Sequence, residues 1–153
     1  MPASAFTLYG ANKSVLNIAD LLTPVIKLAI LTSAYTPNIT SSGHSVWADV
    51  NAAELPNGNG YTSGGVELLD KAAIPRTNGF SFTSAAPAPW VGAGTGLPAH
   101  RFYVMYVVGS LWGKANPLIG YFLGDNIPAN IPLTPVGVPR IVAPGANGWF
   151  DAV

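Results

Sequence analysis

Residues 101–123 read RFYVMYVVGSLWGKANPLIGYFL, and this stretch decides the fold class. It begins with an apolar run, residues 101–108, that is rich in the aromatic and β-branched side chains typical of strands. A second apolar run occupies residues 117–123, and the segment between the two runs has the glycine and asparagine content of a hairpin connection. The pattern therefore predicts two adjacent antiparallel strands.

Further strand candidates lie on both sides of this pair, and they do not alternate regularly with helices. They are VIKLAIL at 25–31, VELLDKAAI at 66–74, GFSFT at 79–83, and two C-terminal segments at 138–142 and 149–153 that we expect to close the sheet. Short strands separated by turn signals are typical of sandwiches and barrels. We predict an all-β fold, a single-domain antiparallel β-sandwich that is jelly-roll-like and has extended loops and termini.

The chain has 153 residues, which suits one domain spanning residues 1–153. Apolar side chains at helical spacing predict one short helix near residues 13–22. Residues 32–65 are dominated by Ser, Thr, Asn, Gly and Pro and predict a long, ordered loop, packed either on its own sheet or on a neighbouring molecule. An extended, proline-rich C-terminal segment is predicted over residues 127–153.

Composition bears on the classes of partner. Only 9% of the residues are charged and seven basic residues balance seven acidic ones, so little repulsion keeps copies apart and assembly is favoured over a hydrated monomer. The basic residues are scattered singly, which argues against nucleic-acid binding. The best apolar run is far shorter than the roughly 20 residues of a membrane-spanning helix, which argues against a membrane protein. The N-terminus lacks a secretory pattern, so we expect synthesis in a cytoplasm.

Residues that carry acid–base, nucleophilic or metal chemistry are few and lack diagnostic spacing. The histidines are His44 and His100, and the set Ser42, His44 and Asp49 lacks the G-x-S-x-G motif of one class of catalytic serine. The carboxylates are isolated, residues 49–54 lack the ligands of a calcium loop, and there is no cysteine. We therefore expect a non-enzymatic protein with no catalytic residue, no metal site and no cofactor.

The segment NGNGYTSGG, residues 57–65, is rich in turn-forming residues. Its two Asn-Gly pairs adopt positive φ readily, and Gly64 and Gly65 allow a sharp bend before the next strand. Tyr61 is expected to anchor this turn.

Four pieces of sequence, in this order, carry a resemblance: IKLAILTSAYTPN, H-x-x-W-x-D-V, E-L-x-x-x-x-GYTSGGVEL, and RFYVMY followed by NPLIGYF. The order resembles that of small virion proteins of tailed bacteriophages and covers residues 25–123. A Pro/Ala-rich insert at 85–98 and the proline-rich tail depart from the pattern. The most specific part of the resemblance comprises Trp47, Asp49, Glu54, Gly60, Tyr61, Gly64 and Gly65.

The resemblance implies a β-sandwich-like component of the phage particle, of the capsid decoration or cement type, which stabilises the shell by bridging capsomers. The expected partners are the major capsid protein and further copies of this chain. A trimer is the first expectation, because shell subunits meet at local threefold positions. The expected location is the capsid surface of the virion, after synthesis in the cytoplasm of the bacterial host.

The contact surfaces are expected in the 32–65 loop and in the extended termini. Removal of residues 141–153 should accordingly weaken particle binding more than the isolated fold. Three alternatives remain open: a tail, head–tail connector or fibre component; a carbohydrate-binding module that uses a tryptophan; and an enzyme that cleaves polysaccharide.

Overall fold

The structure, a computed structural model, describes residues 5–125 and 130–152, and its secondary structure is mostly β-strand. This confirms the all-β class. The helical segment differs from the prediction, because two one-turn helices, α1 (Gly10–Lys13) and α2 (Ile18–Leu21), replace one helix near 13–22. The side chain of Asn17 accepts a hydrogen bond from the Ala19 amide, and this cap starts α2 separately.

A five-stranded sheet forms the centre of the molecule, in the order β1-β10-β7-β2-β3. Its strands are β1 (Thr7–Leu8), β2 (Val25–Leu31), β3 (Val66–Glu67), β7 (Phe102–Val108) and β10 (Leu118–Leu123). The pairing of β2 with β7 extends over the full length of both strands, from Val25 opposite Val108 to Leu31 opposite Phe102. It is antiparallel, as all the pairings of this sheet are.

The hairpin predicted between β7 and β10 is confirmed. The two strands pair antiparallel, and the connection contains a small ladder of its own, β8 (Ser110–Leu111) with β9 (Lys114–Ala115). Trp112 and Gly113 form the tip with φ of 53° and 72°, the left-handed conformation that two-residue hairpin turns require.

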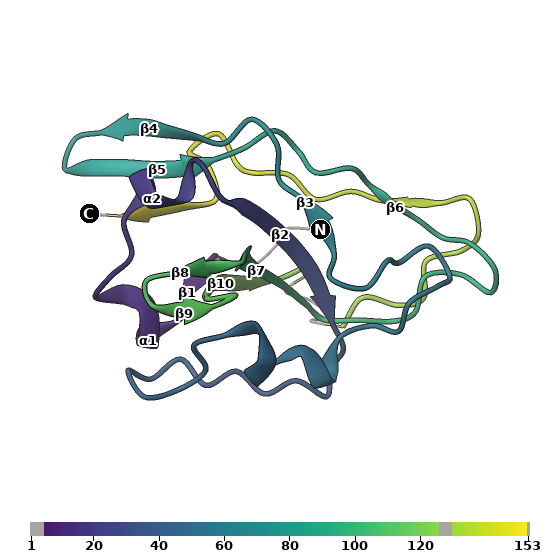
Figure 1. Cartoon of the computed structure of the whole chain (residues 1–153). Coiled ribbons are helices and arrows are strands. Elements are labelled where there is room, and N and C mark those ends of the chain that lie inside the picture. Colours follow the sequence, from purple (N-terminus) through teal and green to yellow (C-terminus); the bar gives the residue numbers. More distant parts are fainter. Residues whose placement is uncertain (1–4, 126–129, 153) are drawn as a thin grey trace.

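Both faces of the central sheet are covered (Figure 1). One face packs against a three-stranded sheet, β12-β5-β4, with the apolar contacts centred on side chains such as Met105 and Phe82. The other face packs against the 32–65 loop. The strands of the smaller sheet are β4 (Ala72–Arg76), β5 (Gly79–Thr83) and β12 (Phe150–Ala152).

The 32–65 loop therefore packs on its own sheet. It has no long strand or helix, only the 3₁₀ turns η1 (Trp47–Asp49) and η2 (Asn51–Ala53). It buries an apolar side chain at intervals, as Tyr35, Val50 and Tyr61 are 6%, 2% and 2% exposed. These side chains complete the second apolar cluster and the edge of the first.

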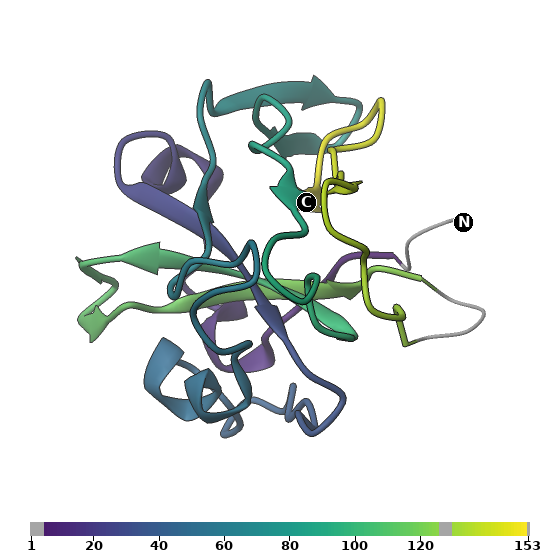
Figure 2. The same cartoon turned by 90° about the vertical axis from the view of Figure 1, so that its right-hand side faces the viewer.

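Two segments far apart in sequence, residues 90–97 and 131–141, form an arm that extends from the layered body (Figures 1 and 2). Strand β6 (Trp90–Val91) pairs antiparallel with β11 (Pro139–Arg140), and isolated bridges join Leu97 to Thr134 and His100 to Ile131. We call residues 90–97 and 131–141 the arm.

The expectation that the two C-terminal segments close the central sheet is wrong. β11 pairs with β6 in the arm, and β12 pairs with β5 in the smaller sheet. Trp149 and Phe150 are 9% and 7% exposed and belong to the core, so removal of residues 141–153 is now expected to unfold the domain rather than to spare it. Residues 127–129 and Val153 of the predicted tail lie outside the described residues.

Within the part of the chain that the structure describes, no helix has the length and apolarity to cross a membrane.

The sharp bend predicted at Gly64 and Gly65 is present. Their φ angles are +90° and +82°, in the region that favours glycine. The surroundings of the two differ, because a Cβ on Gly65 would lie 2.1 Å from the carbonyl oxygen of Leu28, whereas a Cβ on Gly64 would first meet the hydroxyl of Tyr106 at 3.4 Å. Only Gly65 is required by backbone packing as well as by conformation.

We predict that Gly65→Ala lowers the free energy of unfolding by at least about 3 kcal/mol, since it adds a clash with the β2 backbone to the conformational cost. Gly64→Ala is the matched control, with a similar φ but no clash, and should lower it by about 1 kcal/mol. Denaturant titrations of both variants measure the difference. Equal losses in the two variants would contradict the close approach at Gly65.

Candidate functional site

Three of the residues singled out by the sequence meet beside strand β2. The Oε1 atom of Glu54 accepts hydrogen bonds from the Tyr61 hydroxyl at 2.7 Å and from the Gly64 amide at 2.5 Å. The Tyr61 oxygen in turn accepts the amide of Ile30, a β2 residue, at 3.2 Å. Burial of this hydroxyl raises the pKa of Tyr61, so it remains a neutral donor. The prediction that Tyr61 anchors the turn is confirmed.

Tyr106 connects a fourth residue, Trp47, to this group. The Tyr106 hydroxyl donates to the Gly64 carbonyl at 2.7 Å, and its ring stacks on Trp47 with centroids 4.3 Å apart and planes 7° apart. We call Trp47, Glu54, Tyr61, Gly64 and Tyr106 the loop anchor, because they fasten the 32–65 loop to β2 and β7. Sequence reasoning did not single out Tyr106, although its place among the alternating side chains of residues 101–108 put it on one face of the strand.

The other three residues of the resemblance lie apart from the loop anchor's hydrogen bonds. Asp49 Oδ2 accepts the amides of Ser45 and Val46 at 2.8 and 3.1 Å, and these bonds lower the pKa of Asp49. Gly60 and Gly65 mark close backbone approaches, since a Cβ on Gly60 would lie 2.0 Å from the Val91 carbonyl oxygen. The contacts of all seven motif residues hold the loop in place.

We predict that Tyr61→Phe lowers the free energy of unfolding by about 1–3 kcal/mol, because the Ile30 amide and one Glu54 oxygen each lose a partner in a partly buried place. Tyr121→Phe is the control, since Tyr121 lies in the same sheet and its hydroxyl makes no hydrogen bond among the described residues. Denaturant unfolding of both variants makes the comparison. A loss in the Tyr61 variant no larger than in the control would argue against the anchor.

His100 lies in a buried hydrogen-bonded chain at the base of the arm. Its Nδ1 donates to the Pro98 carbonyl at 2.9 Å, which leaves Nε2 to accept the Tyr103 hydroxyl at 2.7 Å. Arg140 Nε donates to the same Tyr103 oxygen at 2.9 Å, and Arg140 Nη2 donates to the Gly124 carbonyl at 3.0 Å. Every polar atom of the imidazole thus has a partner that suits the neutral ring, and the chain ties β11 to β7.

Burial lowers the pKa of His100 to about 4, with a smaller contribution from the positive charge of Arg140. His100 is 1% exposed. The unfolded chain therefore takes up this proton at a higher pH than the folded protein, and the resulting stabilisation, present above the unfolded pKa of roughly 6.5, is lost as the pH falls towards 4.

We predict that the free energy of unfolding decreases by about 3 kcal/mol between pH 7 and pH 4 through this one group. A His100→Gln variant lacks the titration, so its unfolding free energy should change less over the same window. Denaturant titrations across the pH range test this, and parallel curves for wild type and His100→Gln would contradict it.

The serine, histidine and carboxylate of the 42–49 segment do not assemble into a triad. His44 Nδ1 accepts from the Tyr35 hydroxyl at 3.0 Å and from the Asn38 amide at 3.3 Å, while Asp49 binds backbone amides. No group of three potential metal ligands occurs among the described residues. In the described part of the chain, Asp49 and Glu54 serve as acceptors for their own loop.

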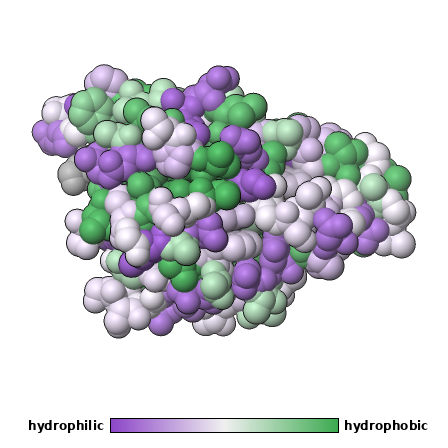
Figure 3. All heavy atoms as spheres, in the orientation of Figure 1, coloured by the Kyte–Doolittle hydropathy of each residue, from purple (hydrophilic) through white to green (hydrophobic). Residues whose placement is uncertain are grey.

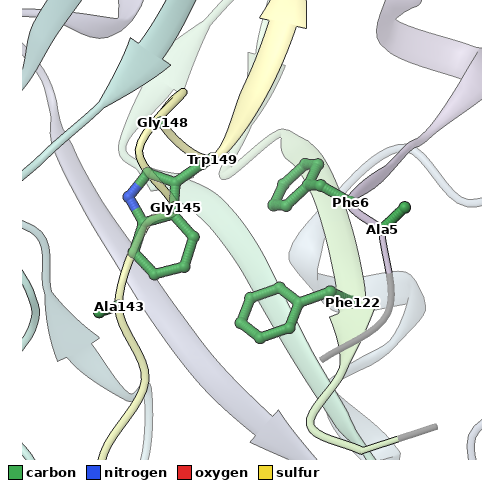
Figure 4. A pocket seen from close by; sticks show the side chains of 7 residues that line it. All are labelled: Ala5, Phe6, Phe122, Ala143, Gly145, Gly148 and Trp149. Carbon is green, nitrogen blue, oxygen red and sulfur yellow. The ribbon is translucent and has the colours of Figure 1, made fainter. Parts of the chain in front are cut away.

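An aromatic pocket of about 310 Å³ opens between the N-terminal segment, β10 and the C-terminal tail (Figure 4). The rings of Phe6, Phe122 and Trp149 face it, with Phe122 lying 6.2 Å from Phe6 and 5.7 Å from Trp149 between centroids. The indole nitrogen of Trp149 donates a hydrogen bond to the Ser84 hydroxyl at 2.8 Å. The full lining is Ala5, Phe6, Phe122, Ala143, Gly145, Gly148 and Trp149.

The other tryptophans are engaged in packing. Trp90 is 5% exposed, Trp47 stacks on Tyr106, and the Trp112 indole donates to Asp20 at 3.0 Å. Of the four tryptophans, only Trp149 borders the pocket in Figure 4, and it is itself only 9% exposed.

Comparisons with models of protein families, with curated proteins and with solved structures give no match for this chain. Its function is therefore argued from the residues and their geometry.

Proposed function

We propose that this chain is a non-enzymatic structural protein of a tailed-bacteriophage particle, most specifically a capsid decoration or cement protein. The observation that carries the proposal is the apolar outer surface of the arm. Four of its side chains, Leu133, Val136, Val138 and Ile141, are 50%, 60%, 44% and 64% exposed. Apolar side chains gathered on a protruding element are typical of a surface that another protein covers.

The arm also lacks charge on its outer surface. Arg140 is the one charged residue in residues 90–97 and 131–141, and its guanidinium bonds to Tyr103 and Gly124 at the base of the arm. Figure 3 shows hydrophobic and near-neutral residues, together with some hydrophilic ones, where the molecule extends to the right of its body. Charged residues are depleted at the centres of protein interfaces, so this composition favours a protein partner.

Two further observations support a binding role over catalysis. Both histidines and the loop carboxylates Asp49 and Glu54 hold local structure, with their lone pairs engaged by backbone amides or tyrosine hydroxyls. The arm is tied to the body through His100, whose backbone bridges to Ile131 and whose ring is hydrogen-bonded to Tyr103 of β7.

In this proposal the partners are the major capsid protein and further copies of this chain, on the capsid surface of the virion. A trimer suits local threefold positions of a shell and multiplies the contacts of each arm. A jelly-roll-like sandwich belongs to the same proposal, supported by two sheets of unequal width that share one apolar core. A tail, connector or fibre protein is the alternative, and the pocket beside Trp149 is the feature that favours a sugar-binding fibre.

The copy number in purified virions, relative to the major capsid protein, tests the proposal by quantitative mass spectrometry. A ratio near unity supports decoration of the whole shell. A very small ratio indicates the connector, tail or fibres, and absence from the particle overturns the structural role.

We predict that the double variant Val136→Asp and Ile141→Asp folds normally but binds particles at least about tenfold more weakly, because both side chains are mostly exposed and lie in the apolar surface of the arm. Leu69→Asp is the control, 59% exposed and outside the arm. Cosedimentation with particles that lack the protein measures binding. Wild-type binding by the double variant would exclude the arm as the contact.

A further inference from the structure

One corner of the central sheet is left open by the 32–65 loop. The corner forms a pocket of about 480 Å³ on the face that carries Phe102 and Tyr121. The loop reaches its rim at Pro37 and does not extend over it. The lining is Ala5, Thr7, Pro37, Arg101, Phe102, Tyr121 and Leu123.

Arg101 is the only charged residue in this lining, and its guanidinium forms no ion pair with any residue that the structure describes. Among the described residues the one ion pair joins Arg76 to Asp151, on the smaller sheet. Arg101 Nε is buried without a hydrogen-bond partner, and Cζ lies 5.4 Å from the centre of the Phe102 ring. A half-buried guanidinium without a carboxylate partner among the described residues is a costly arrangement in the free protein, and a carboxylate bound at its terminal nitrogens would offset that cost.

The backbone of Arg101 is fixed independently of its side chain. Its amide donates to the Leu31 carbonyl at 3.1 Å, and its carbonyl accepts the Gly124 amide at 3.3 Å. These bonds fix the backbone position from which the side chain reaches the pocket. The position is therefore pre-organised, which reduces the entropy lost on binding.

We infer that this corner is a carboxylate-binding pocket that receives an acidic side chain, flanked by apolar residues, from a partner subunit. The guanidinium would bind the carboxylate through its two terminal nitrogens, since Nε is buried. That the partner is another virion subunit rests on the proposed function. That the pocket binds a carboxylate rests on the residues of the pocket alone.

The lining favours a peptide over an acidic sugar. Besides Arg101, the hydroxyls of Thr7 and Tyr121 are the polar side-chain groups in it, and the remaining side chains are apolar. A hexuronate carries several hydroxyls that would lose water without finding partners there. An acidic residue between apolar neighbours places one charge on Arg101 and apolar groups against Phe102 and Leu123.

The test is titration of the purified protein with a blocked peptide that has one glutamate between two leucines, followed by NMR amide shifts. We expect shifts at Phe102, Tyr121 and Leu123, at least about tenfold weaker binding of the matched glutamine peptide, and weakening with salt. Arg101→Gln should lower the affinity about tenfold and melt as wild type does, because its main-chain bonds remain. Lys13→Gln, an exposed cation elsewhere, should change nothing.

Equal binding of the two peptides, wild-type affinity in Arg101→Gln, or no binding of the glutamate peptide would overturn the inference, as would preferential binding of a methyl glucuronoside. If Arg101→Gln does not fold, Arg101→Lys replaces it, and it should bind more weakly than wild type because it lacks the planar fork. The copy number in virions distinguishes failure of this inference from failure of the proposed function. If the protein is present in virions but binds no carboxylate, the inferred carboxylate pocket is wrong and the proposed structural role stands.

Discussion

The pairing of β2 with β7 is the interaction on which the other layers depend. Both strands carry apolar side chains on both faces, because Ile26, Leu28 and Ile30 point to one side while Ala29 and Leu31 point to the other. A sheet of this kind is stable in water only when both faces are covered. The smaller sheet covers one face and the 32–65 loop covers the other, so the three layers follow from a single ladder.

A layer without long strands or helices must satisfy its backbone polar groups in other ways. The 32–65 loop does so with main-chain bonds to β2, such as the Leu55 amide to the Ile30 carbonyl, and with the loop anchor. The polar groups in these contacts are mostly neutral, and a chain of tyrosine and histidine side chains, Tyr9 to Tyr35 to His44, extends the same principle. This explains how a protein with 9% charged residues keeps its interior ordered.

The arm and the Arg101 corner are the two surface features to which we assign binding. The arm presents apolar side chains to solvent, and the corner presents the guanidinium of Arg101, which has no ion-pair partner in the described part of the chain. Main-chain bonds fix the Arg101 backbone, and the hydrogen bonds of His100 and Arg140 to Tyr103 hold the arm to β7. For a protein proposed to act by binding other subunits, one apolar and one charged contact at fixed positions favour specific recognition.

The sequence by itself determined the all-β class, the β7–β10 hairpin, the buried strand β2 and the bend at Gly64 and Gly65, because each depends on local periodicity or on a backbone conformation that few residues adopt. The sequence also indicated every residue of the loop anchor except Tyr106. Only the tertiary structure decided that β11 pairs in the arm, that β12 joins the smaller sheet, and that Arg101 forms no ion pair within residues 5–125 and 130–152. Strand partners and missing contacts depend on segments far apart in the chain, whose meeting is set by packing and leaves no short-range pattern.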